Sequence, residues 1–327
     1  MSNTFGKIIK VHLFGASHDN VVGVVIEGIP AGINIIEDDF IEYINRRKGG
    51  SVGTTDRVEA DNPKILTGII DEYTTGLPIT IVFENKNKNS IPYQLYKSWH
   101  RPGHADFTQK SKYGKYADIR GGGIASGRMT LPLMIAGVIA SKCIPNVNAK
   151  AFIAHINGEK PDKIDWQKIR NEGDSLGGEI ICILENIIAG IGEPFFDNIE
   201  SYFSHLFFSI PGIKAVGFGD AWQTAFMRGS EYNDIFISND GQTTTNHCGG
   251  IQGGITNGNA IVIHLIVRPP ASIKKEQISL NFDTDELEKR KITGSHDLAF
   301  ILRLPPIIEA VSLLAIADLY LYSKIYS

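Results

Sequence analysis

The segment GASHDNVVGVVIEGIPAGI, residues 15–33, recurs further along the chain as GDSLGGEIICILENIIAGI, residues 173–191. The two copies align without gaps at a shift of 158 positions (173 minus 15). Identical residues include Gly15, Ser17, Glu27, Ala31, Gly32 and Ile33. Each copy has a β-branched run that ends in a glycine turn, which predicts a strand, and residues 7–14 predict another. Coincidence is the competing interpretation, because short matches of glycine and β-branched residues are common.

A helical pattern follows each copy of the repeat. Phe40, Ile41 and Ile44 are apolar at helical spacing, which predicts a helix over Asp38–Arg47. A corresponding helix is expected after the second copy, over Asp197–Phe203. The two copies therefore predict two structural units of similar order, each with strands followed by a helix.

Each half of the chain also contains a longer apolar run of helical character. Arg128 precedes the run at residues 131–140, and Arg303 precedes the run at residues 304–322. These patterns predict one α+β domain with internal pseudo-two-fold symmetry. The domain spans residues 1–327, its halves lie at about 1–145 and 165–327, and the polar residues 144–170 are expected to connect them.

The composition is that of an ordinary globular protein, with 43% hydrophobic and 21% charged residues among 327. A formal net charge of −4 gives no basic surface for nucleic acid. The apolar runs are too short or too interrupted to span a bilayer, and the N-terminus lacks signal-peptide features. Cys143, Cys182 and Cys248 are widely spaced, which favours reduced thiols. A cytoplasmic protein with no nucleic-acid or membrane partner is expected.

The run RPGHADFTQKSKYGKYADIRGGGIASGRMT, residues 101–130, gathers a histidine, several cations and three consecutive glycines. Gly121–Gly123 permit close approaches that a β-carbon would block. Backbone N–H groups at the start of the next helix, together with Arg128, favour a bound anion. The run therefore predicts an anion-binding active site. Residues 84–100 precede it without apolar periodicity and predict a surface loop, either inert or a lid.

Three of the nine histidines lie among glycine and polar residues: His18 in GASHDN, His104 in RPGHAD and His296 in GSHD. Each is a candidate general acid or base, and a structural role is an equal alternative on spacing alone. A structural role is favoured for the histidines in apolar or strand surroundings: His12, His155, His205 and His264.

A further glycine cluster, HCGGIQGGITNG, spans residues 247–258. Two interpretations stay open: glycines packed against a flat ligand or a phosphate, and tight turns in a sheet. The sequence RPPAS at residues 268–272 follows one strand later and could close such a pocket. The sequence contains neither the dinucleotide fingerprint nor a P-loop. It also lacks zincin histidine spacing and calcium-type carboxylate clusters, so no metal site is expected.

Taken together, these motifs resemble the chorismate synthase family over nearly the whole chain and in the same order. The matching motifs are GASHDN, VVIEGIPAGI, the Arg46-Arg47 pair, RPGHAD, KYGKYADIRGGG, DSLGG, IIAGIGEPFFD, SIPGIKAVGFG, RGSEYND, TNHCGGIQGGITNG, and GSHD followed by Arg303 and Glu309. The resemblance implies a sandwich of helices between antiparallel sheets, assembled as a homotetramer. It also implies a 1,4-elimination of phosphate from 5-enolpyruvylshikimate 3-phosphate, a small anionic substrate, to give chorismate.

The resemblance further implies reduced FMN as cofactor, supplied by an external reductant because the chain has no flavin-reductase domain. By resemblance, His18 protonates the departing phosphate, His104 acts as an acid beside the flavin, and Asp297 takes part in proton removal. Arg47 binds the substrate or the phosphate of a reductant such as NADPH. The other substrate cations are Arg46, Arg128 and Arg303, and the FMN contacts are Ser126, Pro211, Gly253, Arg268, Pro269 and Ser272.

The chain departs from the family pattern at several polar positions. The family motif GGGRSSARET reads GGGIASGRMT here, so Ile124 and Ala125 replace an arginine and a serine, and Met129 replaces an acid. Ser295 replaces a further arginine. Lys10, Lys48 and Lys112 are candidates to compensate for the lost cations. The departures keep two alternatives open: a flavin-dependent paralogue with a less anionic substrate, and a non-catalytic scaffold subunit.

Overall fold

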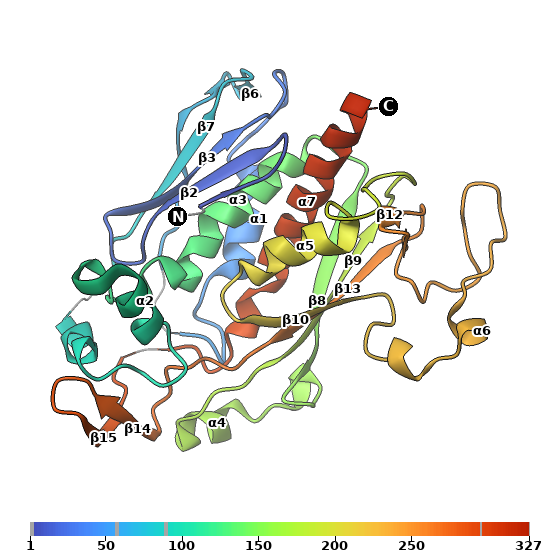
Figure 1. Ribbon diagram of the computed structural model, residues 1–327. Helices are drawn as coiled ribbons and strands as arrows, with labels where there is room; N and C mark the ends of the chain where they lie inside the picture. Colours follow the sequence, from blue (N-terminus) through green and yellow to red (C-terminus); the bar gives the residue numbers. More distant parts are fainter. Residues whose placement is uncertain (1–2, 56–58, 88–90, 295, 327) are drawn as a thin grey trace.

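The computed structural model describes residues 3–55, 59–87, 91–294 and 296–326, so Ser295 lies outside the described residues. Two antiparallel sheets enclose a layer of helices (Figure 1). The first sheet has the strand order β1-β2-β3-β7-β4, and the second has the order β10-β13-β9-β8. The expected α+β fold, with helices between antiparallel sheets, is confirmed.

The bounds of these elements follow. The first sheet contains β1 (Thr4–Phe5), β2 (Lys10–Gly15), β3 (Val21–Glu27), β4 (Lys64–Thr67) and β7 (Ile79–Glu84). The second contains β8 (Asn148–Ile156), β9 (Gly178–Glu185), β10 (Ile213–Phe218) and β13 (Ile261–Val267). The helical layer contains α1 (Asp38–Arg47), α3 (Thr130–Ser141), α5 (Ile199–Phe208) and α7 (Pro305–Tyr326).

Smaller elements lie around this sandwich. Three short hairpins are β5 (Ile69–Ile70) with β6 (Tyr73–Thr74), β11 (Ile251–Gln252) with β12 (Ile255–Thr256), and β14 (Glu276–Asn281) with β15 (Glu286–Lys291). The shorter helices are α2 (Asp106–Tyr113), α4 (Trp166–Glu172) and α6 (Gly229–Tyr232). The 3-10 turns nearest the site are η1 (Ile91–Lys97), η3 (Gly123–Ala125), η4 (Gly127–Met129) and η7 (Phe300–Arg303).

The two sheets share one topology. In the first, β2 pairs with β3, β3 with β7, and β7 with β4. In the second, β8 pairs with β9, β9 with β13, and β13 with β10. The last pair of each sheet contains a register shift, at Ile65/Thr67 and at Ile213/Ala215. The repeated sequence segments form β3 and β9, which take equivalent places in the two sheets.

Two expectations about connections are wrong. Asn148–Ile156, assigned to a connection, forms the edge strand β8, whose polar residues alternate with apolar ones because one face is exposed. Within residues 84–100, assigned to a loop, Ile91–Lys97 forms the 3-10 helix η1. The side chains of Tyr96 and Trp99 there pack into a small cluster of their own with Ile292. An isolated cluster of this size leaves no periodic pattern in the sequence.

The centre of the sandwich is the contact between α3 and α7. Their backbones approach so closely at Gly137 that a β-carbon there would lie 2.0 Å from the carbonyl oxygen of Ala310. By length and composition α7 could cross a membrane, but 78% of its most apolar window is buried inside the fold, as in a core helix. The buried carboxylate of Asp318 accepts hydrogen bonds at 2.7 Å from the backbone N–H groups of Lys7, Ile8 and Ile9. Because these N–H groups bond to Asp318, they do not pair with another strand. The strand expected over residues 7–14 therefore starts only at Lys10, as β2.

Candidate active site

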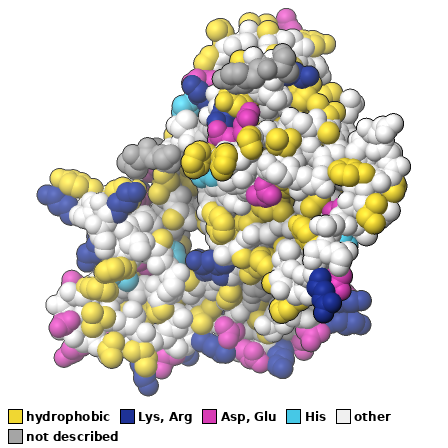
Figure 2. Space-filling view, turned by 45° about the vertical axis from the view of Figure 1, so that its right-hand side comes forward, with side chains coloured by type: hydrophobic (Ala, Val, Ile, Leu, Met, Phe, Trp, Pro, Cys, Tyr) yellow, Lys and Arg dark blue, Asp and Glu magenta, His cyan; other side chains and the backbone are white. Residues whose placement is uncertain are grey.

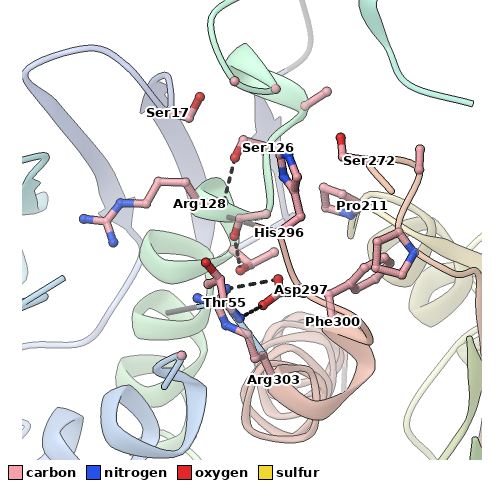
Figure 3. A pocket seen from close by; sticks show the side chains of 18 of the residues that line it. Ser17, Thr55, Ser126, Arg128, Pro211, Ser272, His296, Asp297, Phe300 and Arg303 are labelled. Carbon is pink, nitrogen blue, oxygen red and sulfur yellow. Dashed lines mark hydrogen bonds and ion pairs between the residues drawn. The ribbon is translucent and has the colours of Figure 1, made fainter. Parts of the chain in front are cut away.

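A cavity of about 330 Å³ collects residues from both halves of the chain. It lies where α1 ends and where α3 and α7 begin, and Figure 3 shows its side chains converging. In the space-filling view, a hollow separates the smaller, lower left part of the surface from the larger part beside it. Basic and histidine side chains lie at the edges of this hollow (Figure 2). The lining cations are Arg47, Lys48, Arg101, Arg128, Arg268 and Arg303, and the lining carboxylates are Glu59, Asp61 and Asp297. Because two helix N-termini add partial positive charge, this cavity favours an anionic ligand.

His104 is held by the first residue of α2. Its Nδ1 lies 2.7 Å from Oδ1 of Asp106, and the guanidinium of Arg101 donates to the same carboxylate at 2.7 and 2.8 Å. Burial disfavours the charged carboxylate, but the hydrogen bonds from Arg101 and His104 outweigh burial and hold the pKa of Asp106 well below its usual range. Burial lowers the pKa of His104 despite its bond to Asp106. Neutral His104 therefore carries its proton on Nδ1, and Nε2 remains for a ligand.

His18 is buried in the turn that follows β2. Its ring packs edge-to-face against Tyr93 of η1, with 5.0 Å between the ring centroids and 78° between the planes. Gly121 lies against the same imidazole, and a β-carbon there would stand 2.9 Å from Nε2 and Cδ2 of His18. The φ angle of Gly121 is +63°, which also favours glycine. The first glycine of the triple therefore makes room for His18.

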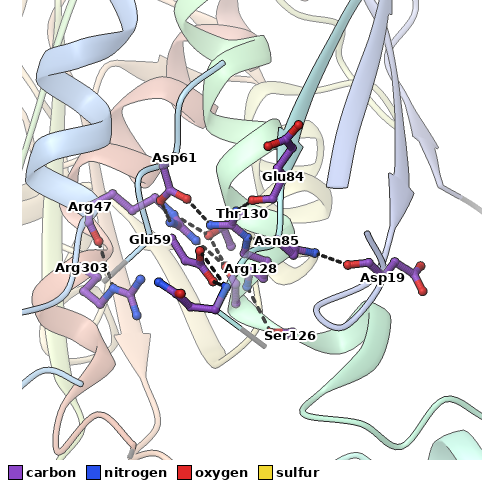
Figure 4. Close-up of polar contacts among 12 residues, drawn as sticks. Asp19, Arg47, Glu59, Asp61, Glu84, Asn85, Ser126, Arg128, Thr130 and Arg303 are labelled. Atoms are coloured by element: carbon purple, nitrogen blue, oxygen red, sulfur yellow. Dashed lines mark hydrogen bonds and ion pairs between the residues drawn. The ribbon is translucent and has the colours of Figure 1, made fainter. Parts of the chain in front are cut away.

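Arg47 and Arg128 share the carboxylate of Asp61 (Figure 4). Nη1 of Arg47 lies 3.5 Å from Oδ2, the guanidinium of Arg128 contacts Oδ1, and Nη2 of Arg47 donates to the Gly127 carbonyl at 2.9 Å. Burial and the nearby Arg303 lower the pKa of Arg47 to about 9, although Asp61 opposes this shift. Two cations thus share one carboxylate, and a bound anion would relieve the remaining repulsion.

Asp297 lies beside Thr55 and Arg303 in the wall of the cavity (Figure 3). Its Oδ1 accepts a hydrogen bond of 2.7 Å from the backbone N–H of Thr55, and its Oδ2 accepts one of 3.3 Å from Nη1 of Arg303. Nε of Arg303 donates to the carbonyl of Arg47 at 2.9 Å. The neighbouring His296 also lines the cavity, and burial lowers its pKa. A carboxylate held at both oxygens can receive a proton from a ligand at this wall.

The structure brings most of the sequence-predicted site residues together. Those that line the cavity are His18, His104, Asp297, Ser126, Pro211, Arg268, Ser272, Arg47, Arg128 and Arg303. Three others are not part of its described lining. Arg46 is turned to the next face of α1, where its guanidinium forms two hydrogen bonds of 2.7 Å with Glu309. Gly253 forms the turn between β11 and β12, and Pro269 is exposed.

The glycine cluster at residues 247–258 forms tight turns and is not part of the described lining of this cavity, and its contact with a ligand stays a prediction. Gly249, Gly250, Gly253 and Gly254 all have positive φ angles, and β11 and β12 form a short hairpin. Of the three candidate lysines, only Lys48 lines the cavity, while Lys10 and Lys112 are exposed elsewhere. Of the three described replacements, Ala125 lines this cavity, whereas Ile124 and Met129 do not.

Sequence reasoning missed Tyr93, Arg101, Glu59 and Asp61 as site residues. For Arg101 and Asp106 a signal was available, since a histidine flanked within three residues by a cation and a carboxylate forms a charge-assisted triad easily. Asp61 had no local signal. Its left-handed backbone, with φ of +54°, and its placement between two arginines arise only when α1 and α3 meet.

Comparison with known proteins gives one consistent result. The family model for chorismate synthase matches residues 9–321. A chorismate synthase from Chitinophaga pinensis is 46% identical over 323 residues, which cover 98% of this chain and 97% of that protein. A second, from Pyrococcus abyssi, is 36% identical, with 98% of each chain covered.

A solved structure described as a crystal structure of chorismate synthase superposes with a TM-score of 0.74. The match covers 98% of this chain and 93% of that chain at 20% identity, so it bears on the fold alone. It agrees with the sandwich described above. From the family model and the full-length relatives it follows that the chain belongs to the chorismate synthase family of lyases.

Proposed function

We propose that this chain eliminates phosphate from 5-enolpyruvylshikimate 3-phosphate by a 1,4-elimination to give chorismate, using reduced FMN without net redox change. The observation that carries the proposal is the charge of the cavity, where, among the residues that the structure describes, six cations face three carboxylates beside His18 and His104. The substrate has one phosphate and two carboxylates. A surplus of fixed cations is what such a ligand requires.

The cations differ in what remains free for a ligand. Arg101, Arg303 and the Arg47–Arg128 pair each contact a carboxylate of the protein. For Lys48 and Arg268, the described residues provide only neutral oxygen partners, from Asn45 and Pro269. We assign the first anchoring of anionic groups to these two cations, and the finer orientation to the paired arginines.

The cavity wall fits a flavin. Pro211, Pro270 and Phe300 give apolar surface for a flat ring system, and Ser126 and Ser272 give hydroxyl groups nearby. Arg268 would hold an anionic group of the cofactor, and its guanidinium lies 6.0 Å from the ring centre of Phe300. Bound reduced flavin supplies electron density transiently and recovers it, so no net oxidation occurs. Nε2 of His104 would accept a proton beside it and, once protonated, give that proton back.

The elimination breaks the carbon–oxygen bond to phosphate, removes one proton from the ring and forms one double bond. His18 would donate a proton to the departing phosphate, whose charge rises as the bond breaks. Asp297 would take up the ring proton, directly or through the cofactor. Their placement in one cavity, on elements from both ends of the chain, supports these roles.

Two rival functions remain as alternatives. A flavin-dependent paralogue with a less anionic substrate is less well supported, because the cavity keeps its surplus of cations. A non-catalytic scaffold subunit is opposed by the ordered Arg101–Asp106–His104 contacts, since a scaffold has no need to orient a histidine. Binding of FMN without turnover of the shikimate compound would favour the paralogue.

We also propose a cytoplasmic homotetramer that receives reduced flavin from an external reductant. Large apolar side chains are exposed on the loop before α5 and on the segments around α6, and they support association. They include Phe195, Phe196, Phe226 and Phe236. The chain around α6 extends away from the sandwich (Figure 1).

The decisive experiment is an anaerobic assay with chemically reduced FMN and 5-enolpyruvylshikimate 3-phosphate, in which phosphate and chorismate are both measured. Equal release of the two products supports the proposal. A folded, flavin-saturated protein that releases neither contradicts it. Full activity with NADPH and oxidised FMN alone would contradict the external supply of reduced flavin.

A further inference from the structure

A second cavity, of about 370 Å³, adjoins the first. It is enclosed by β1, β2, η3, the start of α3 and the end of α5. Ala125, Thr130 and Pro211 line both cavities, so they form a shared wall. The remaining lining residues are Asn3, Thr4, Phe5, Val11, Leu13, Ile124, Met129, Leu133, His205, Leu206 and Ser209.

The chemistry of this second cavity is the opposite of the first. Its described lining contains no lysine, arginine, aspartate or glutamate, and most of its side chains are apolar. Three of them, Ile124, Ala125 and Met129, are the positions where the motif of residues 121–130 departs from the polar residues of the family pattern. These three side chains add to the apolar lining of the cavity. An ionised ligand would lose its hydration here without gaining a partner, which selects for an uncharged ligand.

The size of the cavity points to a ring-bearing ligand. Protein interiors are close-packed, and empty apolar space lowers stability in proportion to its volume. An apolar cavity of roughly 150 Å³ is enough to bind benzene in another protein. The rings of Phe5 and His205 meet edge-on at 5.4 Å, and Met129 adds a polarisable sulfur to the same lining. These groups favour a flat aromatic ring. His205 and Ser209 are exposed, so the cavity reaches solvent at the end of α5.

We propose that this second cavity is a binding site for an uncharged aromatic molecule of one or two fused rings. Its occupant would contact Ala125, Thr130 and Pro211 from behind the anion-binding cavity. The site is independent of the chemistry proposed above, since neither substrate nor flavin is needed to fill it.

The test uses indole as the probe and the full chain with its methionine, isoleucine and leucine methyl groups labelled for NMR. Indole is expected to bind saturably and to shift the methyl signals of Ile124, Met129 and Leu133. In Ile124→Arg its affinity should fall by at least about tenfold, because a guanidinium then enters the apolar space. Ile188→Arg is the control, since Ile188 is 55% exposed and lines neither cavity. Indole-3-carboxylate should bind at least about tenfold more weakly than indole, because its charge would be desolvated.

The outcomes separate clearly. Saturable binding with shifts at the three methyl groups, lost in Ile124→Arg and kept in Ile188→Arg, supports the site. The proposal is overturned when millimolar indole gives no saturable shift in the unsubstituted protein, when the shifted signals lie elsewhere, or when Ile124→Arg binds indole unchanged. No turnover is measured, so failure here is distinct from failure of the proposed lyase reaction.

Discussion

Oδ1 of Asp106 lies 2.7 Å from Nδ1 of His104, and the same carboxylate receives two hydrogen bonds from the guanidinium of Arg101. Asp106 is only 1% exposed, so both partners depend on it without help from solvent. It fixes the tautomer of His104 and balances a buried cation at once. One carboxylate therefore couples the stability of the site to the protonation of its histidine.

Asp106→Asn tests this coupling. The free energy of unfolding should fall by about 3–5 kcal/mol, because Arg101 is left as a buried charge without its partner. Asp106 raises the pKa of His104, so its removal should lower that pKa further. If His104 acts as an acid, the alkaline limb of the pH–rate profile then moves to lower pH. Urea unfolding and kcat measured against pH check the two effects.

The acid stability of the unsubstituted protein follows from the same residue. The hydrogen bonds from Arg101 and His104 hold the pKa of Asp106 below the usual pKa of an aspartate, so its contribution to stability is complete above that usual pKa and is lost as the pH falls further. Asp106→Asn should lack this acid-dependent component. His104→Ala provides the comparison, because it should abolish turnover while Arg101 and Asp106 keep their pair. Unchanged turnover in His104→Ala would remove this histidine from the mechanism.

A matched pair of glycines tests the fit of His18. Gly121 and Gly114 have similar φ angles of +63° and +58°, but only Gly121 has atoms near its missing β-carbon. Both alanine variants should lose about 1–3 kcal/mol of stability from backbone strain, Gly114→Ala the more, because φ of 58° with ψ of −134° favours glycine strongly. Only Gly121→Ala should also reduce kcat, because its methyl group would displace His18. Equal kcat in the two variants would show that His18 tolerates displacement.

Removal of Asp61 should destabilise the site through its arginines. Asp61→Asn leaves Arg47 and Arg128 as close, buried cations without their shared carboxylate, at a cost of about 3–5 kcal/mol. The double variant Asp61→Asn/Arg128→Met should recover a large part of that loss, since the repulsion is gone. Denaturant unfolding of both single variants and the double variant completes the cycle. Additive losses would mean that the two side chains do not interact.

The fold was largely predictable because its main elements bury regular faces. The repeat at Gly15 and Gly173 located β3 and β9, and the apolar runs located α3 and α7. β8 was missed because an edge strand exposes polar residues that resemble a connection. η1 was missed because Tyr96 and Trp99 pack in an isolated cluster rather than in the main core. Neither error concerns a strongly periodic segment.

The site was predictable only in part, since motifs identify residues and the fold decides their partners. Arg46 and Arg47 are adjacent in the sequence, yet a helix turns them about 100° apart, and only Arg47 reaches the cavity. Asp61 became recognisable only when the fold placed it between two arginines. The glycines at residues 247–258 were ambiguous because ligand contacts and tight turns demand the same residue.

Lys48 should be the cation that compensates for arginines missing from the family pattern. It lines the cavity, and its Nζ lies 3.1 Å from the neutral Oδ1 of Asn45, so its charge is available to a ligand. A charge-assisted hydrogen bond contributes about 1.5–3 kcal/mol. Lys48→Met should therefore raise KM for the anionic substrate by roughly ten- to a hundredfold, with a smaller change in kcat. Lys10→Met is the control, because Lys10 is exposed on β2 outside the cavity. Equal KM values for the two variants would assign the compensation to the arginines of the cavity instead.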